Sequence, residues 1–324
     1  MTEGPEFTTE PAAATRHPRS AALVARARAQ GRVPAAVIYP CSAGTLAGAL
    51  EASVAGLIAP VLVGPRDRIE RIAQEHRLDL GGMRFVDADS PLDSAQRASA
   101  LAHAGEVRFL LKGSLHSDEL IKGVATRKAG LLTRRRLSHV FVMDIPAHER
   151  LLLIADAAIN VAPNLRVKRD ITQNAIDLAH TLGIARPKVA VLSATEEVNP
   201  AVPSSVDAAA LRDMAQRGEI VGGIVDGPLA FDNAISAAAA QIKGIASPVC
   251  GAVDIVIMPG VEAGNILYKS LVYLSDAVAG GVVLGLRVPV VLTSRADSME
   301  SRVTSAAIAC LLAHERGKSE PKPV

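Results

Sequence analysis

Short apolar runs alternate along the chain with longer segments in which apolar residues recur every three or four positions. The first pattern is typical of buried strands and the second of amphipathic helices. Strand–helix alternation of this kind indicates an α/β fold. In the first half, strands are predicted at 35–39, 60–63, 84–86, 107–111 and 139–143. Helices are predicted at 20–30, 66–76, 90–103 and 115–126, and a further helix of small residues follows Gly44 and ends at about residue 55.

The second half repeats the alternation. Its strands are predicted at 152–155, 158–159, 188–192, 222–225, within 250–258 and at 288–292, and its helices at 167–182, 205–216, 231–242 and 301–313.

The stretch 253–273 is the most informative part of this pattern. It reads as a buried strand, a Pro-Gly break and a loop ending on Gly264-Asn265, after which a helix begins. We expect Asn265 to cap that helix, with Lys269 one turn further along the same flank. Free amides and the helix dipole at such a start favour an anionic ligand.

Composition narrows the class of protein. The chain has 324 residues, of which 49% are hydrophobic but only 2% aromatic, a profile that favours parallel sheets covered by Ala-rich helices. A net charge of +2 argues against nucleic-acid and membrane partners, and the few aromatics argue against a base-stacking platform. The most apolar run, 277–286, is too short to span a bilayer.

The cysteines and the chain ends point to a protein of the cytoplasm. The three cysteines are far apart, which argues against a structural zinc site and suits a reducing compartment. Residues 1–19 lack the basic start and apolar centre of a signal peptide. We expect this stretch and residues 317–324 to be flexible tails.

Polar residues follow several predicted strands, at the sheet edge where α/β proteins bind ligands. Lys112-Gly113 could meet a phosphate, although a solvent-exposed lysine fits equally, and Asn160 could line a cleft. Asp226 could face a substrate or form a turn, and His139 has the setting of a core or turn histidine.

The strand at 288–292 ends in Thr293-Ser294-Arg295. An arginine fork beside a serine hydroxyl can hold a phosphoryl group, and a carboxylate one or two turns later could act as a base. The alternative is that Ser294 caps a helix and Arg295 pairs with Glu300 on the surface. The sequence has no GxSxG motif and no Cys-His pair, which disfavours covalent catalysis through Ser or Cys. It has no Walker loop or GxGxxG motif to support nucleotide binding, and no HExxH motif.

Six ordered segments together resemble the phosphate acetyltransferase and butyryltransferase family, with TSRADSMES closer to the butyryl branch. They are LLKGSLHSDELIKGV (110–124), LSHVFVMDIP (137–146), DAAINVAPNL (156–165), VDGPLAFDNAIS (225–236), MPGVEAGNILYKSL (258–271) and VPVVLTSRADSMESR (288–302).

This resemblance implies a two-domain, three-layer αβα fold like that of isocitrate and isopropylmalate dehydrogenases, with an interdomain cleft. The first domain would comprise residues 20–145 and 288–316, and the second 146–287. The resemblance also implies a cytoplasmic homodimer that moves an acyl group between coenzyme A and phosphate, through acyl phosphate. Coenzyme A would be a substrate, with no tightly bound cofactor and no metal.

The resemblance assigns roles residue by residue. Ser294 and Arg295 match the motif that engages the thiol and the phosphoryl group. The acetyl branch has a catalytic Asp where this chain has Ser301, so Glu300 is predicted as the base, with Asp297 and His116 as alternatives. Lys112, Asn265 and Lys269 would contact phosphate or acyl phosphate. Further substrate contacts would come from Gly113, Ser138, Asn160, Asp226, Pro228, Gly264 and Thr293.

Two other functions remain open at this point. A dehydrogenase of the same fold would need an acidic metal cluster, which the sequence does not reveal. The missing Asp is compatible with a non-catalytic binder of acyl-CoA or phosphate. The length of the acyl group, acetyl, butyryl or branched, is also open.

Overall fold

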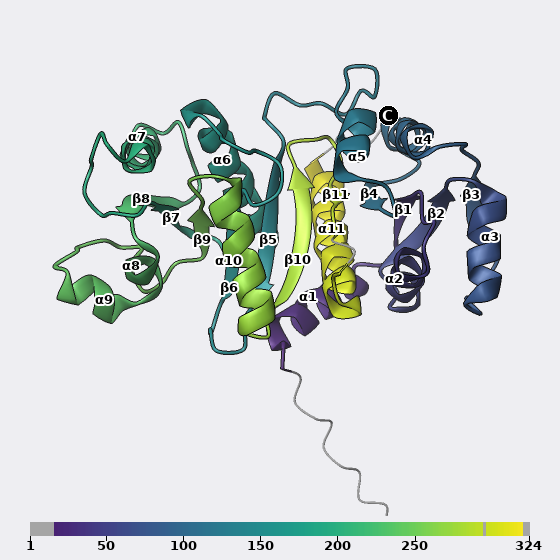
Figure 1. Ribbon diagram of the computed structural model, residues 1–324, viewed down its shortest axis with the longest axis horizontal. Helices are drawn as coiled ribbons and strands as arrows, with labels where there is room; N and C mark the ends of the chain where they lie inside the picture. The colour runs from purple at the N-terminus through teal and green to yellow at the C-terminus, as the bar shows by residue number, and fades with distance from the viewer. Residues whose placement is uncertain (1–15, 294–295, 320–324) are drawn as a thin grey trace, which may run out of the picture.

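The computed structural model describes residues 16–293 and 296–319, and these form one mixed sheet covered by helices on both faces (Figure 1). In their order across the sheet the strands are β3 (Arg84–Val86), β2 (Ile58–Val63), β1 (Val33–Ile38), β4 (Phe109–Lys112), β11 (Val290–Val291), β10 (Val278–Leu284), β5 (Ser138–Asp144), β6 (Leu151–Ala155), β9 (Ile255–Ile257), β7 (Lys188–Leu192) and β8 (Ile224–Leu229).

Most of the helices lie close to the ranges that the sequence pattern predicts. They are α1 (Pro18–Ala29), α2 (Ala43–Val54), α3 (Arg66–Glu75), α4 (Pro91–His103), α5 (Ser117–Val124), α6 (Leu165–Thr181), α7 (Pro203–Gln216), α8 (Phe231–Ile235), α9 (Ala237–Ile242), α10 (Val261–Leu274) and α11 (Met299–Ser319).

Strand direction changes at the centre of the sheet. Parallel pairing joins β3, β2, β1, β4 and β11, and again joins β6, β9, β7 and β8. Between these groups, β10 is antiparallel to both β11 and β5, and β5 is antiparallel to β6. The expected parallel sheet is therefore correct for each half and wrong at their junction, since β10 and β11 are joined by a connection too short for a parallel crossover.

Alternate residues of β5 define the two faces of the sheet. Val140 and Val142 belong to a buried cluster with residues of α6 and α11, whereas Phe141 and Met143 belong to a cluster with Tyr268 of α10. In the first half, α4 and α5 supply a third cluster, opposite α1 and α2. The helix–sheet–helix arrangement has the three layers that were predicted.

The final segment of the chain returns to the first half of the sheet. β11 lies between β4 and β10, with Val291 opposite both Leu111 and Val282. α11 then packs against α1, α2 and β10. Because one sheet runs through both halves, the division into domains at 20–145 with 288–316 and at 146–287 stays a proposal.

Several predicted boundaries are wrong. The run 277–286, noted only for its length, is the central strand β10, and Ala158 and Ile159 form bends rather than a strand. The helix predicted at 231–242 is interrupted at Ser236, whose side chain caps α9. At the N-terminus, α1 begins at Pro18, so the tail expected at 1–19 extends too far.

Candidate functional site

A hydrogen bond between α10 and the segment that precedes α11 marks the candidate site. The hydroxyl of Tyr268 on α10 donates to Oδ1 of Asp297, 3.0 Å away, in the segment between β11 and α11. The Tyr268 ring stacks on Phe141 of β5, with centroids 3.7 Å apart and ring planes 4° from parallel. Burial raises the pKa of Tyr268, and the negative charge of Asp297 raises it further, so the phenol stays protonated and donates.

His139 lies beside this aromatic pair. Its ring is fully buried and meets Phe141 edge-on, with centroids 4.2 Å apart. Burial lowers the pKa of His139 to about 4, although the carboxylate of Asp156 and the carbonyl of Leu292 favour the charged form. Neither ring nitrogen has a hydrogen-bond partner with acceptable geometry among the described residues. The imidazole is therefore neutral at physiological pH.

Asp156 organises the loop that follows β6. Its carboxylate accepts hydrogen bonds from the backbone amides of Ala158, Ile159 and Asn160 at 2.9, 3.1 and 3.3 Å. The Asn160 side chain donates to Asp156 at 2.6 Å and to the carbonyl of Leu137 at 2.8 Å. The amide nitrogen of Asn160 is thus engaged in holding the loop against the start of β5.

Asn265 does not cap α10 as predicted. The capping residue is Gly260, in extended conformation, and Asn265 lies in the second turn with its side chain donating to the carbonyl of Ala157 at 3.2 Å. The reason lies at Gly264, where a Cβ would lie 2.7 Å from the carbonyl oxygen of Asp156. Gly264 therefore lies inside the helix, where it packs closely against the backbone of Asp156, and is not a loop residue.

The first half of the sheet contributes the ends of β4 and β11. Lys112 is buried at the end of β4, and the strand register places Leu292 beside it, directly before the buried Thr293. Gly113 follows with its amide bonded to the carbonyl of Ile38 at 2.9 Å, and a Cβ there would lie 2.3 Å from that oxygen. Lys112, Gly113 and Thr293 are therefore brought together, as predicted.

The acid predicted as the base is displaced from this site. Glu300 is exposed on the first turn of α11 and lines a hollow of about 370 Å³ with residues of α1 and α2. Ser301 is buried, and its hydroxyl accepts from the amide of Ala279 at 3.4 Å. Asp297, the alternative acid, is the one that faces Tyr268. His116 is exposed at the start of α5, and Ser294 and Arg295 lie outside the described residues.

Three predicted substrate contacts lie elsewhere in the sheet. Asp226 and Pro228 are on the edge strand β8, with six strands between them and Lys112, so that seven steps of about 4.8 Å give a separation of roughly 34 Å. Ser138 is buried on the face of α6, where it accepts from Asn174 at 2.9 Å. Lys269 is exposed on α10, one turn beyond Asn265.

Sequence reasoning missed Tyr268, although it lies inside the MPGVEAGNILYKSL segment. The available signal was its rarity, since the chain has only three tyrosines. Among residues 16–293 and 296–319, three or more His, Cys, Asp or Glu side chains are nowhere grouped so that they could hold a metal. Within the same ranges, each helix is too short or too polar to cross a membrane.

Comparison with known proteins gives the class of this chain. Residues 82–310 match the family described as phosphate acetyl/butaryl transferase. The phosphate acetyltransferase of Rhizobium meliloti is 53% identical over 294 residues, covering 91% of this chain and 93% of that protein. The phosphate butyryltransferase of Clostridium acetobutylicum is 41% identical over 258 residues, covering 80% and 86%.

Comparison with solved structures supports the same class of protein. A branched-chain phosphotransacylase from Enterococcus faecalis V583 superposes with a TM-score of 0.76 at 32% identity, covering 87% of this chain and 99% of the other. A 4-hydroxythreonine-4-phosphate dehydrogenase from Klebsiella pneumoniae shares the fold alone, with a TM-score of 0.52 at 16% identity over 87% and 99% of the two chains. The predicted dehydrogenase-like fold is confirmed.

The chain belongs to the phosphate acetyltransferase and butyryltransferase family. The predicted resemblance is thus confirmed, whereas the preference for the butyryl branch is not. The acetyltransferase from Rhizobium meliloti shares more of its sequence with this chain than the butyryltransferase from Clostridium acetobutylicum does.

Proposed function

We propose that this chain is a phosphate acyltransferase, which transfers a short-chain acyl group reversibly between coenzyme A and phosphate. Membership of the family supports the reaction class. The observation that carries the site assignment is the Tyr268–Asp297 hydrogen bond, which joins α10 to the segment directly after Thr293-Ser294-Arg295.

The proposed chemistry is direct attack of the thiol on acyl phosphate. A thiol has a pKa of about 8.5, so most of it is protonated near neutral pH and a base assists its attack on the acyl carbonyl. As the sulfur–carbon bond forms, the bond between the acyl carbon and the phosphate oxygen breaks and phosphate leaves. We assign Asp297 as the group that takes the thiol proton, in place of Glu300.

The proposed substrate contacts follow from the placement of the cations. Lys112 at the end of β4 and Lys269 on α10 would hold the phosphate, with Ser294 and Arg295 as transition-state groups by family resemblance. Gly113 and Thr293, which follow β4 and β11, would make further contacts with substrate. Asn160 and Asn265 would act through the loop at Asp156, since the amide nitrogens of both side chains donate within the protein.

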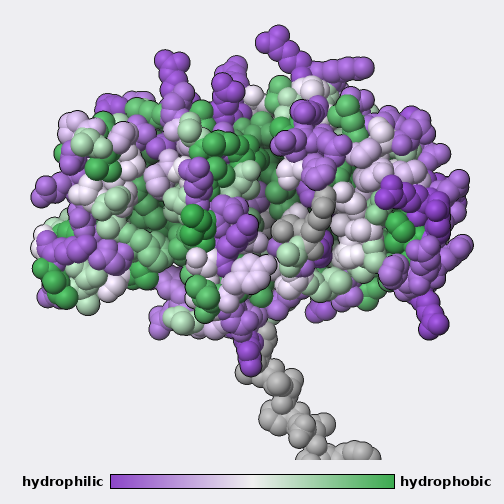
Figure 2. Space-filling view, in the orientation of Figure 1, coloured by the Kyte–Doolittle hydropathy of each residue, from purple (hydrophilic) through white to green (hydrophobic). Residues whose placement is uncertain are grey.

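A homodimer is part of the proposal. Ile266, Tyr273 and Leu274 are 66%, 70% and 83% exposed on one side of α10, and Figure 2 shows hydrophobic surface beside this helix among hydrophilic side chains. Such a stripe is suited to pairing with a second copy of the chain. Ile266→Asp combined with Leu274→Asp should shift the mass in light scattering to that of a monomer. Val54→Asp, at a 79% exposed position on α2, is the matched control.

We place the enzyme in the cytoplasm. Its three cysteines are free, and Cys41 and Cys310 are buried as thiols, which suits a reducing compartment.

The decisive assay follows thiol release from acetyl-, butyryl- and isobutyryl-CoA in the presence of phosphate or arsenate. Turnover with at least one substrate is expected, and the preferred chain length comes from comparing kcat/KM. Arg295→Ala should lower turnover without changing the melting temperature. Coenzyme A binding without turnover would instead support a non-catalytic binder, and dinucleotide reduction with a hydroxy acid would support a dehydrogenase.

A further inference from the structure

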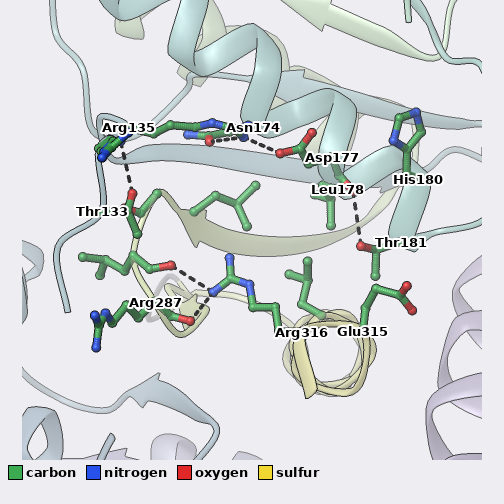
Figure 3. Close-up of a pocket in the computed structure, with 15 residues that line it drawn as sticks. Thr133, Arg135, Asn174, Asp177, Leu178, His180, Thr181, Arg287, Glu315 and Arg316 are labelled. Carbon is green, nitrogen blue, oxygen red and sulfur yellow. Dashed lines mark hydrogen bonds and ion pairs between the residues drawn. The ribbon is translucent and has the colours of Figure 1, made fainter. Parts of the chain in front are cut away.

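A second cavity lies on the sheet face opposite the proposed catalytic site. It has a volume of about 690 Å³, within the range of small-molecule sites. Its walls come from α6, from the C-terminal part of α11, from residues 133–135 and from residues 284–287 (Figure 3). Because α6 and α11 cover the face away from Tyr268, the proposed acyl transfer makes no use of this cavity.

Backbone contacts fix the shape of the cavity. Gly285 has a φ of +90°, and a Cβ at this position would lie 2.4 Å from the carbonyl oxygen of Arg136. The hydroxyl of Thr133 donates to the carbonyl of Gly285 at 2.7 Å. These contacts hold the 284–287 turn against the 133–136 segment, so two walls of the cavity are joined without a ligand.

The cavity is positively charged. Four arginines, at positions 134, 135, 287 and 316, face two carboxylates, those of Asp177 and Glu315. Arg135 forms an ion pair with Asp177. Within the described ranges, no ion pair is formed by Arg134 or Arg287, both of which are exposed. Two guanidinium groups are thus available to an anion.

Arg316 is held at the centre of the cavity. Its Nη1 donates to the carbonyls of Leu286 and Arg287 at 2.9 and 2.7 Å, and Figure 3 shows the side chain pointing between the walls. Burial lowers the pKa of Arg316, which reports a cation with reduced hydration. An anion entering the cavity would replace part of the electrostatic stabilisation by water that the Arg316 cation has lost on burial.

The lining suits a ligand with both phosphate and organic parts. Guanidinium forks match the geometry of phosphoryl oxygens, and three separate arginines can contact more than one phosphate. The leucines at 178, 284 and 312 line the cavity from α6, β10 and α11 and offer apolar contact. We propose that this cavity binds a small organic molecule carrying two or more phosphate groups.

ATP and tripolyphosphate are the probes, and calorimetry on the full chain measures their binding. Coenzyme A itself carries several phosphate groups and could enter the cavity, so paired variants rather than saturation with coenzyme A separate the cavity from the catalytic site. The exposed pair Arg134→Ala/Arg287→Ala should weaken ATP binding by at least about tenfold, because each charge-assisted contact is strong. Arg71→Ala/Arg186→Ala removes the same charge from two other exposed positions and should leave the affinity unchanged.

Four outcomes would overturn the proposal. The first is no binding of either probe at millimolar concentration, and the second is equal weakening by the control pair. The third is a raised KM for coenzyme A in Arg134→Ala/Arg287→Ala with unchanged ATP affinity, which would make the cavity part of the substrate site. Citrate serves as a carboxylate arm, and citrate binding as tight as that of ATP would refute the phosphate preference. The binding measurements with ATP, tripolyphosphate and citrate do not need acyl transfer, so their failure is separate from failure of the proposed function.

Discussion

The hydroxyl of Tyr268 and the carboxylate of Asp297 are hydrogen-bonded at 3.0 Å, although 29 residues separate them along the chain. The contact places a carboxylate at the junction of α10 and the end of β11, beside a stacked aromatic pair. The neighbouring Glu300 faces α1 and α2 instead. Substitution of Asp297 and substitution of Glu300 should therefore affect turnover differently.

Asp297→Asn should lower kcat by about 10²- to 10⁴-fold, the range for loss of a general base, with a smaller change in the KM for coenzyme A. Asparagine can still accept the hydrogen bond from Tyr268, so the fold should be retained. Steady-state kinetics with acetyl phosphate and coenzyme A provide the measurement. Glu300→Gln is the control, and a large loss of turnover there with none in Asp297→Asn would reverse the assignment.

Arg19→Ala should destabilise the fold by about 2–4 kcal/mol. Nε of Arg19 donates to Oδ1 of Asp144 at 2.8 Å, and Asp144 is fully buried in β5, so the substitution leaves a buried carboxylate without its cationic partner. Urea denaturation measures the change. Arg16→Ala breaks the exposed pair with Asp276 and should cost less than about 1 kcal/mol. Equal costs for the two variants would contradict this explanation.

Gly264→Ala should destabilise α10 against the loop at Asp156 by about 1–3 kcal/mol. The added Cβ would meet backbone and Cβ atoms of residues 156 and 157 at 2.7 to 3.0 Å, and backbone cannot rotate away. Gly44→Ala on α2 meets nothing within 4 Å and should be neutral or slightly stabilising. Thermal melts of the two variants test the difference, and a stable Gly264→Ala would show that α10 shifts freely.

The buried His139 should make the stability of the folded chain sensitive to acid. Because burial lowers its pKa from 6.5 to about 4, the unfolded chain binds a proton in this window that the folded chain does not. The stabilisation is complete above pH 6.5 and is lost as pH falls towards 4, with a size on the order of 3 kcal/mol.

His139→Gln should remove this part of the pH dependence, measured as urea midpoints between pH 7 and pH 4.5. A variant with the same acid slope as the parent chain would assign the loss to other groups.

Periodicity predicted most strands and helices because their apolar faces are long and regular. It failed at β10, where Gly280 and Gly281 sit against Ile308 and His139, and a run of small residues carries no alternation. Periodicity also does not give the order of strands in the sheet. Asp226 and Pro228 follow the predicted strand 222–225 but lie within β8 at the sheet edge, far from the other candidates. The orientation of Glu300 depends on the helical phase of α11, and a sequence motif does not fix that phase.

The position of β11 has a consequence during synthesis of the chain. β4 and β10 are separated by a strand whose residues are near the C-terminal end. Until about residue 293 has left the ribosome, β4 keeps an unpaired edge and the first half of the protein cannot close. The last strand translated thus completes the sheet, and a truncated chain that stops before it would expose an aggregation-prone edge at the centre of the molecule.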